Sequence, residues 1–202
     1  TQSTSRRQRQ MCIRDRLEDV LDDARDAARI TIEERSKLED PAARDDLAEL
    51  IGISAVKFTE LSHHRMSDYV FDLEKMVALE GDTAPYLQYS YVRVRSIFRK
   101  LGEEVALDAS IIQLEEKAEI HLARMLSRFG EIVPVVLDGF RPNLLAGYLL
   151  ELARAFHSYF EACPVLKSSG ALRDSRLVLC ELTARILRKG LDLLGIEVPE
   201  RM

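Results

Sequence analysis

The chain has 202 residues, of which 47% are hydrophobic and 31% are charged. This composition can bury a core and argues against global disorder, while no apolar run approaches the ~20 residues of a membrane span, so no membrane partner is expected. The net charge of −5 excludes a protein that binds nucleic acid with its whole surface, so any such role must rest on a local basic face.

The cysteines indicate a reducing compartment. There are three of them, Cys12, Cys163 and Cys180, at irregular intervals and without a CxxC pair. An odd, scattered set is not a disulfide framework, so the expected location is cytoplasmic. Cys163 and Cys180 are expected to be small buried apolar residues.

Residues 1–16 differ from the rest of the chain, because they are rich in Ser, Thr, Gln and Arg and lack an apolar period. They are predicted to be a disordered or non-native leader. Their origin stays open.

A helical period begins at Leu17, and its apolar stripe is Leu17, Leu21, Ala24, Ala28 and Ile32. Pro41 restarts the chain, and a second helix is expected to about Leu61, although Gly52 weakens this prediction. A loop over 62–67 and a short helix over Leu73–Leu79 should follow.

The next helix carries the most informative pattern. Thr83 is a plausible N-cap, and Gly102 marks the end of the helix. Tyr86, Tyr89 and Arg93 stand at i, i+3 and i+7 and therefore share one face, around which further positive charge is supplied by Arg95, Arg99 and Lys100. Aromatic faces beside guanidinium groups suit a single-stranded RNA loop. Tyrosines at helical spacing are nevertheless more often core residues.

The remaining sequence is helical as well. Helices are predicted over Ser110–Phe129, Ile132–Leu137, Pro142–Ala162 and Leu172–Leu194, and Gly195 should end the last one. No segment alternates with a period of two, so the fold class is all-α with a bundle-like C-terminal part. The last helix bears a second basic set, which either joins the RNA face or, for Arg176 and Arg185, pairs internally with Asp174 or Glu181: Arg173, Arg176, Arg185, Arg188 and Lys189.

Several blocks resemble arginyl-tRNA synthetase, a class I aminoacyl-tRNA synthetase. The resemblance rests on residues 67–72 and 80–89 with Arg93, and it extends over about residues 17–202 through Tyr148–Phe156, Cys163–Val165, Arg176–Cys180, Gly190–Ile196 and the final Pro199–Met202. It implies a helical connector from the end of the catalytic domain over 17–82, followed by a helical anticodon-binding domain over 83–202.

The resemblance also implies ATP-dependent attachment of arginine to tRNA(Arg), by a monomer. The two nucleotide-site signatures of class I enzymes are missing, because none of the four histidines lies in a His-x-Gly-His context and Lys75-Met76 is not followed by Ser-Lys. We therefore expect a fragment that begins where the nucleotide site ends. It should have no catalytic residue and no cofactor of its own, and it should be inactive alone. Arginine and ATP, with Mg, would be used only by the missing catalytic part of the parent enzyme.

No metal site is predicted either. His63 and His64 are neighbours, so on a helix they would point about 100° apart and could not share a metal without a third ligand.

In arginyl-tRNA synthetases the C-terminal helical domain contacts the anticodon loop, so the resemblance assigns roles to matching positions. Tyr86 and Tyr89 would stack on loop bases or wedge between them. Arg93 would hydrogen-bond a base edge or a phosphate. Phe160 falls where the family tends to carry an aromatic residue, and Met202, the terminal residue, would lie against the loop.

Two features oppose parts of this assignment. Pro164 occupies a position where some members carry a large aromatic ring, so whether a base stacks there stays open. Phe160 continues the stripe of Leu149, Leu152 and Phe156 and could equally be a core residue.

Two other classes of function stay open: a freestanding helical RNA-binding module, and a helical scaffold without an RNA partner. RNA titration separates either RNA-binding reading from the scaffold. A cysteinyl-type synthetase is the nearest rival family, but the Pro85–Tyr89 block argues against it.

Overall fold

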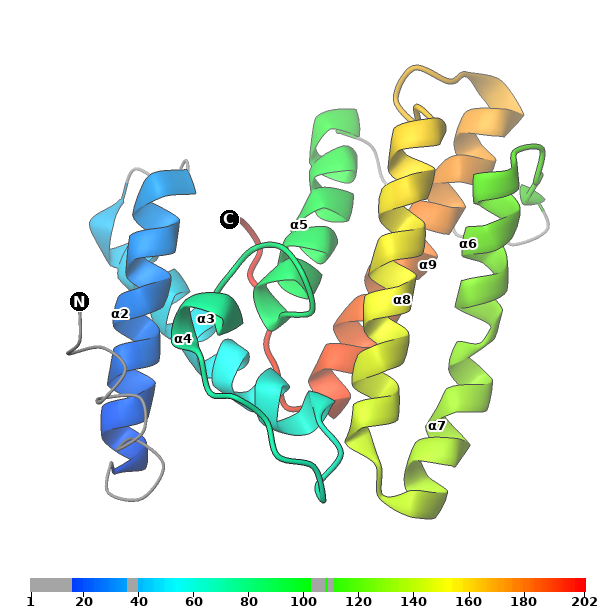
Figure 1. Ribbon diagram of the computed structural model, residues 1–202. Coiled ribbons are helices and arrows are strands. Elements are labelled where there is room, and N and C mark those ends of the chain that lie inside the picture. The colour runs from blue at the N-terminus through cyan, green and yellow to red at the C-terminus, as the bar shows by residue number, and fades with distance from the viewer. Residues whose placement is uncertain (1–15, 36–39, 103–107, 109–110) are drawn as a thin grey trace.

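The computed structural model describes residues 16–35, 40–102, 108 and 111–202, and these contain helices and no strand (Figure 1). The predicted all-α class is confirmed. In chain order the helices are α2 (Leu17–Arg35), α3 (Pro41–Ser62), α4 (Leu73–Met76), α5 (Ala84–Leu101), α6 (Lys117–Ser127), α7 (Phe129–Gly139), α8 (Pro142–Ala162) and α9 (Gly170–Leu193).

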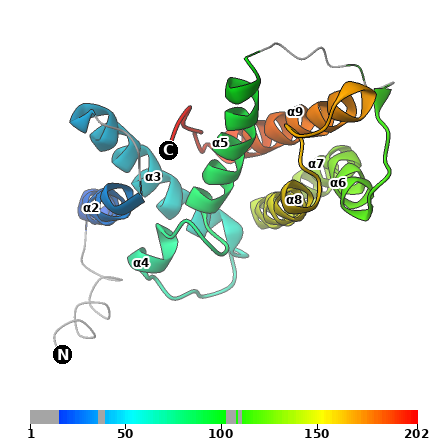
Figure 2. The ribbon, with the colours of Figure 1, turned by 90° about the horizontal axis from the view of Figure 1, so that it is seen from above.

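The helices form two groups on either side of α5. Helices α2 and α3 pack against each other, and α6, α7 and α9 pack against α8 (Figures 1 and 2). The C-terminal residues after α9 return between α3 and α5, as both views show. The end of the chain is therefore placed beside the first turns of α5.

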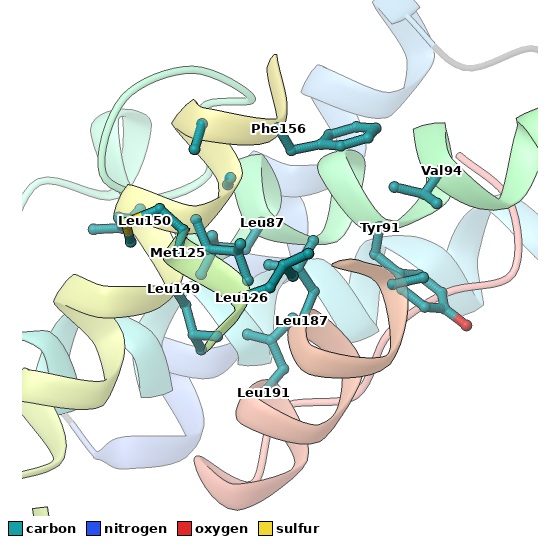
Figure 3. Packing of buried hydrophobic residues seen from close by; sticks show 14 of the residues in the cluster. Leu87, Tyr91, Val94, Met125, Leu126, Leu149, Leu150, Phe156, Leu187 and Leu191 are labelled. Carbon is teal, nitrogen blue, oxygen red and sulfur yellow. The ribbon is translucent and has the colours of Figure 1, made fainter. Parts of the chain in front are cut away.

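Each group has its own buried cluster. The smaller one lies between α2, α3 and α4 and consists of Ala28, Ile32, Leu47, Ala48, Ile51, Ala55, Met76 and Val77. The larger one fills the space between α5, α6, α8 and α9, where Figure 3 shows Leu87, Leu126, Leu149 and Leu187 meeting. Phe58 of α3 is fully buried and belongs to the larger cluster, so α3 is anchored in both.

Polar contacts fix the C-terminal residues between α3 and α5. The buried Gln88 amide donates to Ser54 Oγ at 2.8 Å and to the backbone oxygen of Glu197 at 2.7 Å. Lys57 Nζ donates to the Gly195 carbonyl at 2.9 Å, and Arg99 donates to the Glu200 carbonyl at 3.0 Å. As a result, Met202 packs against both buried clusters.

The residues predicted to begin or end helices are confirmed at three helix ends. Thr83 Oγ1 accepts from the Tyr86 amide at 3.2 Å and so caps α5. Gly102 and Gly195 follow α5 and α9 with φ of 70° and 67°, in the left-handed region that glycine tolerates.

The prediction of a helix over Ser110–Phe129 is wrong at its start, since α6 begins only at Lys117. One tertiary contact and one local capping contact hold the preceding residues out of the helix. The amide of Gln113 donates to Ser175 Oγ at 2.8 Å, and that hydroxyl donates back to the Gln113 carbonyl at 3.0 Å. The Glu119 carboxylate accepts from the amides of Glu115 and Glu116 at 2.8 and 2.9 Å.

Smaller differences concern the other segments. Helix α4 is a single turn that ends at Met76, and α7 is longer than the predicted Ile132–Leu137. Cys163 and Cys180 are buried free thiols, as predicted, and burial raises the pKa of Cys180 to about 12. Apart from Arg16, the predicted leader lies outside the described residues, as does Cys12.

At Gly52, the backbones of α2 and α3 approach each other closely. A Cβ built on Gly52 would lie 2.7 Å from the Arg25 backbone nitrogen and 2.8 Å from the Ala24 carbonyl carbon and oxygen. Backbone atoms of a packed helix cannot move aside cheaply, so Gly52→Ala should lower the free energy of unfolding by at least about 1 kcal/mol. Thermal and urea unfolding of the variant measure this loss.

A second helical glycine provides the matched control. A Cβ on Gly147 of α8 would meet no atom within 4 Å, so Gly147→Ala should raise stability by about 0.5–1 kcal/mol. If Gly52→Ala and Gly147→Ala changed the free energy of unfolding equally, the close packing of α2 on α3 would be contradicted.

Candidate nucleic-acid interface

The exposed face of α5 carries the aromatic residues singled out from the sequence. Tyr89 is 37% exposed, whereas Tyr86 is partly buried against the larger cluster. Burial raises the pKa of the Tyr86 phenol above its ordinary value, although the charges of Arg154 and Arg93 oppose this shift. Tyr91, two residues further along, is only 3% exposed and belongs to the core. Of these three tyrosines, Tyr89 is thus the most accessible to solvent.

Arg93 is held in place by contacts from two helices. Its Nη2 donates to the Tyr89 hydroxyl at 2.9 Å, and its Nη1 lies 2.9 Å from His157 Nδ1. The guanidinium carbon lies 4.8 Å from the centre of the Tyr89 ring and 5.4 Å from that of Phe160. These are cation–π distances, so the guanidinium and the two rings form one unit.

Phe160 reaches this unit from α8. It is 37% exposed, whereas Leu149, Leu152 and Phe156 on the same stripe are buried. Its ring centre lies 6.0 Å from that of Phe156. The stripe therefore leaves the core at Phe160, and the purely internal reading of this residue is wrong.

A pocket of about 510 Å³ opens beside the Tyr89–Arg93 unit, between the two groups of helices. Met202 and Tyr86 line it together with Tyr89 and Arg93. Helix α8 contributes Arg154, Phe156 and His157 to the lining. The α2–α3 side and the segment before α5 contribute mainly apolar residues, among them Ala28, Ile32, Leu47, Ile51, Val77, Leu79 and Gly81. The pocket thus has an apolar interior and an aromatic and cationic side.

An ion pair lies at the same place. Arg154 of α8 lines the pocket and pairs with Asp82, which precedes α5. Arg154 is more than half exposed, so its charge is available at the surface despite the pair.

The basic face of α5 is smaller than the sequence predicted. Arg95 pairs with Glu181 of α9 at 2.6 Å and lies over the Phe98 ring at 5.2 Å. Arg99 donates to the Glu200 carbonyl. Lys100 is exposed. Arg95 and Arg99 are therefore engaged within the fold.

The second basic set needs a correction as well. Arg176 is 7% exposed and pairs with Glu119 at 2.7 Å, not with Asp174 or Glu181, which were the partners read from the sequence. Arg185 does pair with Glu181, at 3.1 Å. Arg176 is a buried structural residue and cannot contact RNA.

Two residues near the site were not picked out from the sequence, His157 and Arg154. Both lie on α8, and with Glu161 they stand at i, i+3 and i+7, on one face of that helix. That spacing was visible in the sequence. Their proximity to Arg93 and Asp82 was not, since it depends on how α8 packs on α5.

Two protein families match the chain. The DALR anticodon binding domain matches residues 87–202, and the catalytic domain of class I (R) tRNA synthetases matches residues 6–73.

Individual relatives agree with these matches. The chain is 45% identical over 189 residues to an arginine–tRNA ligase of Pseudoalteromonas translucida and 48% identical over 194 residues to one of Trichodesmium erythraeum, covering 93% of this chain and 33% of each relative. The chain thus spans about a third of the length of these relatives.

The fold is also similar to solved structures. The arginyl-tRNA synthetase of Thermus thermophilus superposes with a TM-score of 0.83 at 35% identity, covering 92% of this chain and 32% of that one. The arginyl-tRNA synthetase of Plasmodium falciparum superposes with a TM-score of 0.81 at 27% identity, and the match covers 93% of this chain and 34% of that one.

Proposed function

The chain belongs to the DALR anticodon-binding domain family, which matches residues 87–202, and from this premise we propose that it binds the anticodon loop of tRNA(Arg) as the C-terminal part of an arginine–tRNA ligase. The observation that carries the proposal is the convergence of Tyr89, Arg93 and Phe160, together with the adjoining pocket that Tyr86 and Met202 line.

The geometry suits an unpaired RNA loop. A splayed base can stack on the exposed ring of Tyr89 or Phe160, because each base has a π-face whatever its sequence. Arg93 donates two of its five guanidinium N–H groups to Tyr89 and His157. The remaining groups can bind a phosphate or a base edge in the planar manner that lysine cannot reproduce.

The pocket supports the role of Met202. Met202 lines the pocket beside apolar side chains of α2 and α3 and together with Tyr89 and Arg93 of α5, and its flexible, polarizable thioether can adapt to an inserted base. The hydrogen bonds of Gln88, Lys57 and Arg99 to the C-terminal residues hold it there.

We further propose that two parts of the chain have different roles. Residues 17–82 form the C-terminal helical part of the catalytic domain, and residues 83–202 recognise the tRNA. Attachment of arginine, with ATP and Mg, would take place in the part of the relatives that this chain does not match. The expected setting is the cytoplasm and the expected state is a monomer. In the part of the chain that the structure describes, none of the helices combines the length and the apolar character that crossing a membrane requires.

The experiment is a titration of the chain with the anticodon stem-loop of tRNA(Arg) and with a stem-loop of equal length whose loop is unrelated. The arginine stem-loop should bind more tightly. The log–log salt dependence should lie between about −1.4 and −2.1, because two or three phosphate contacts contribute about 0.7 each. Arg95 and Arg99 should add little, since they are engaged within the fold. Equal affinity for both stem-loops would favour a generic RNA module, and no binding would favour a scaffold.

A further inference from the structure

A line of four side chains crosses from α8 to α5 at the proposed RNA-binding face. His157 Nε2 lies 3.2 Å from the Glu161 carboxylate, and His157 Nδ1 lies 2.9 Å from Arg93 Nη1. Arg93 in turn donates to the Tyr89 hydroxyl at 2.9 Å. The guanidinium is thus tied to α8 as well as to its own helix.

The chemistry of these contacts defines the state of the histidine. An arginine side chain can only donate, so His157 Nδ1 must accept and carries no proton. The proton of the neutral ring then lies on Nε2, where it is donated to Glu161. A partner at one ring nitrogen fixes the role of the other, so Glu161 sets His157 as an acceptor for Arg93.

Without His157, Arg93 would be restrained only by its own helix and by the two ring faces. Arginine carries about 2 kcal/mol of rotamer entropy, and bidentate contacts require its planar group to be oriented. A second hydrogen bond from a different helix removes much of this freedom before RNA arrives.

We propose that His157 is a positioning residue of this face, holding the Arg93 guanidinium in the orientation in which its remaining N–H groups meet the RNA. The inference rests on the proposed function and assigns no direct RNA contact to His157. It predicts that His157 acts through Arg93 alone.

Two nearly isosteric variants separate this role from a packing role. In His157→Asn, Oδ1 occupies the position of Nδ1 and can still accept from Arg93; in His157→Leu no acceptor is present. Stem-loop affinity should fall about tenfold for His157→Leu, the equivalent of one hydrogen bond to a charged group. For His157→Asn it should stay within about twofold, because the acceptor is retained. The His157 side chain is 47% exposed, so both variants should have the melting temperature of the wild type.

The coupling to Arg93 is tested by repeating both substitutions in an Arg93→Ala background, where they should bind the arginine stem-loop equally. Equal losses for Asn and Leu in the wild-type background, or an undiminished Leu effect without Arg93, would overturn the positioning role. If Arg93→Ala weakens binding while His157→Leu does not, this inference fails and the proposed function stands. If the wild type does not distinguish the two stem-loops, the proposed function fails and this inference fails with it.

Discussion

Glu119→Gln is expected to lower the free energy of unfolding by about 3–5 kcal/mol, the usual cost of breaking a buried ion pair from one side. Glu119 is fully buried and Arg176 is 7% exposed. In the variant, the guanidinium stays buried without its counter-charge. Chemical denaturation at neutral pH measures the loss.

The hydrogen bonds explain why an amide cannot replace this carboxylate. One oxygen of Glu119 accepts from the amides of Glu115 and Glu116, and the other accepts from Arg176 Nε at 2.7 Å. A glutamine oxygen can serve only one of these two sets. Its NH₂ group then faces another donor, and the start of α6 or the contact to α9 is lost.

The same pair makes stability depend on pH. Burial alone would raise the pKa of Glu119, but the Glu116 amide and the Arg176 guanidinium outweigh it and hold the pKa below its ordinary value. Because the pKa is lower in the folded than in the unfolded chain, the stabilisation is present above the unfolded-state value and disappears as pH falls through the folded-state value. The difference between wild type and Glu119→Gln should therefore shrink as the pH is lowered below the ordinary range of a glutamate.

An exposed pair of the same chemistry serves as the control. Arg128 and Glu151 lie 3.4 Å apart with side chains 45% and 56% exposed. Glu151→Gln should cost less than about 1 kcal/mol. If Glu119→Gln and Glu151→Gln lower the free energy of unfolding by the same amount, the buried pair does not stabilise the packing of α6 on α9.

Tyr89→Ala is expected to weaken binding of the arginine stem-loop by about 1–3 kcal/mol, the usual loss for one aromatic–base stack. Tyr89→Phe should retain most of the affinity, because the ring is kept. Its loss should be small but measurable, since the hydroxyl accepts from Arg93. Arg93→Lys should be costly although the charge is kept, because an ammonium group cannot make planar bidentate contacts. Equilibrium titration of the three variants under the same salt conditions measures these differences.

Local patterns predicted much of this architecture. Thr83 and Gly102 bound α5 through contacts within a few residues, and Pro142 begins α8 as expected. Tyr86, Tyr89 and Arg93 share a face because of helical spacing alone. Such features depend on neighbours in the sequence, so one sequence suffices to find them.

Features that depend on tertiary contacts were missed. The segment before α6 is held by Ser175, which lies 62 residues from Gln113. Arg95 donates to Glu181, 86 residues away, and is therefore engaged within the fold. His157 meets Arg93, which lies 64 residues away on another helix. Phe160 and Met202 became candidates only through the family resemblance, because nothing local separates them from core residues.

The central claim is that Tyr89 belongs to an RNA-binding surface and not to the core, and a comparison with Tyr91→Ala tests it most directly. Melting temperature and stem-loop affinity should be measured on the same samples of Tyr89→Ala and Tyr91→Ala. Tyr89→Ala should keep the melting temperature and lose affinity. Tyr91 is 3% exposed, so its removal should lower stability by about 3–5 kcal/mol while the folded fraction binds normally. A fall in melting temperature for Tyr89→Ala with unchanged affinity of its folded fraction would contradict the account.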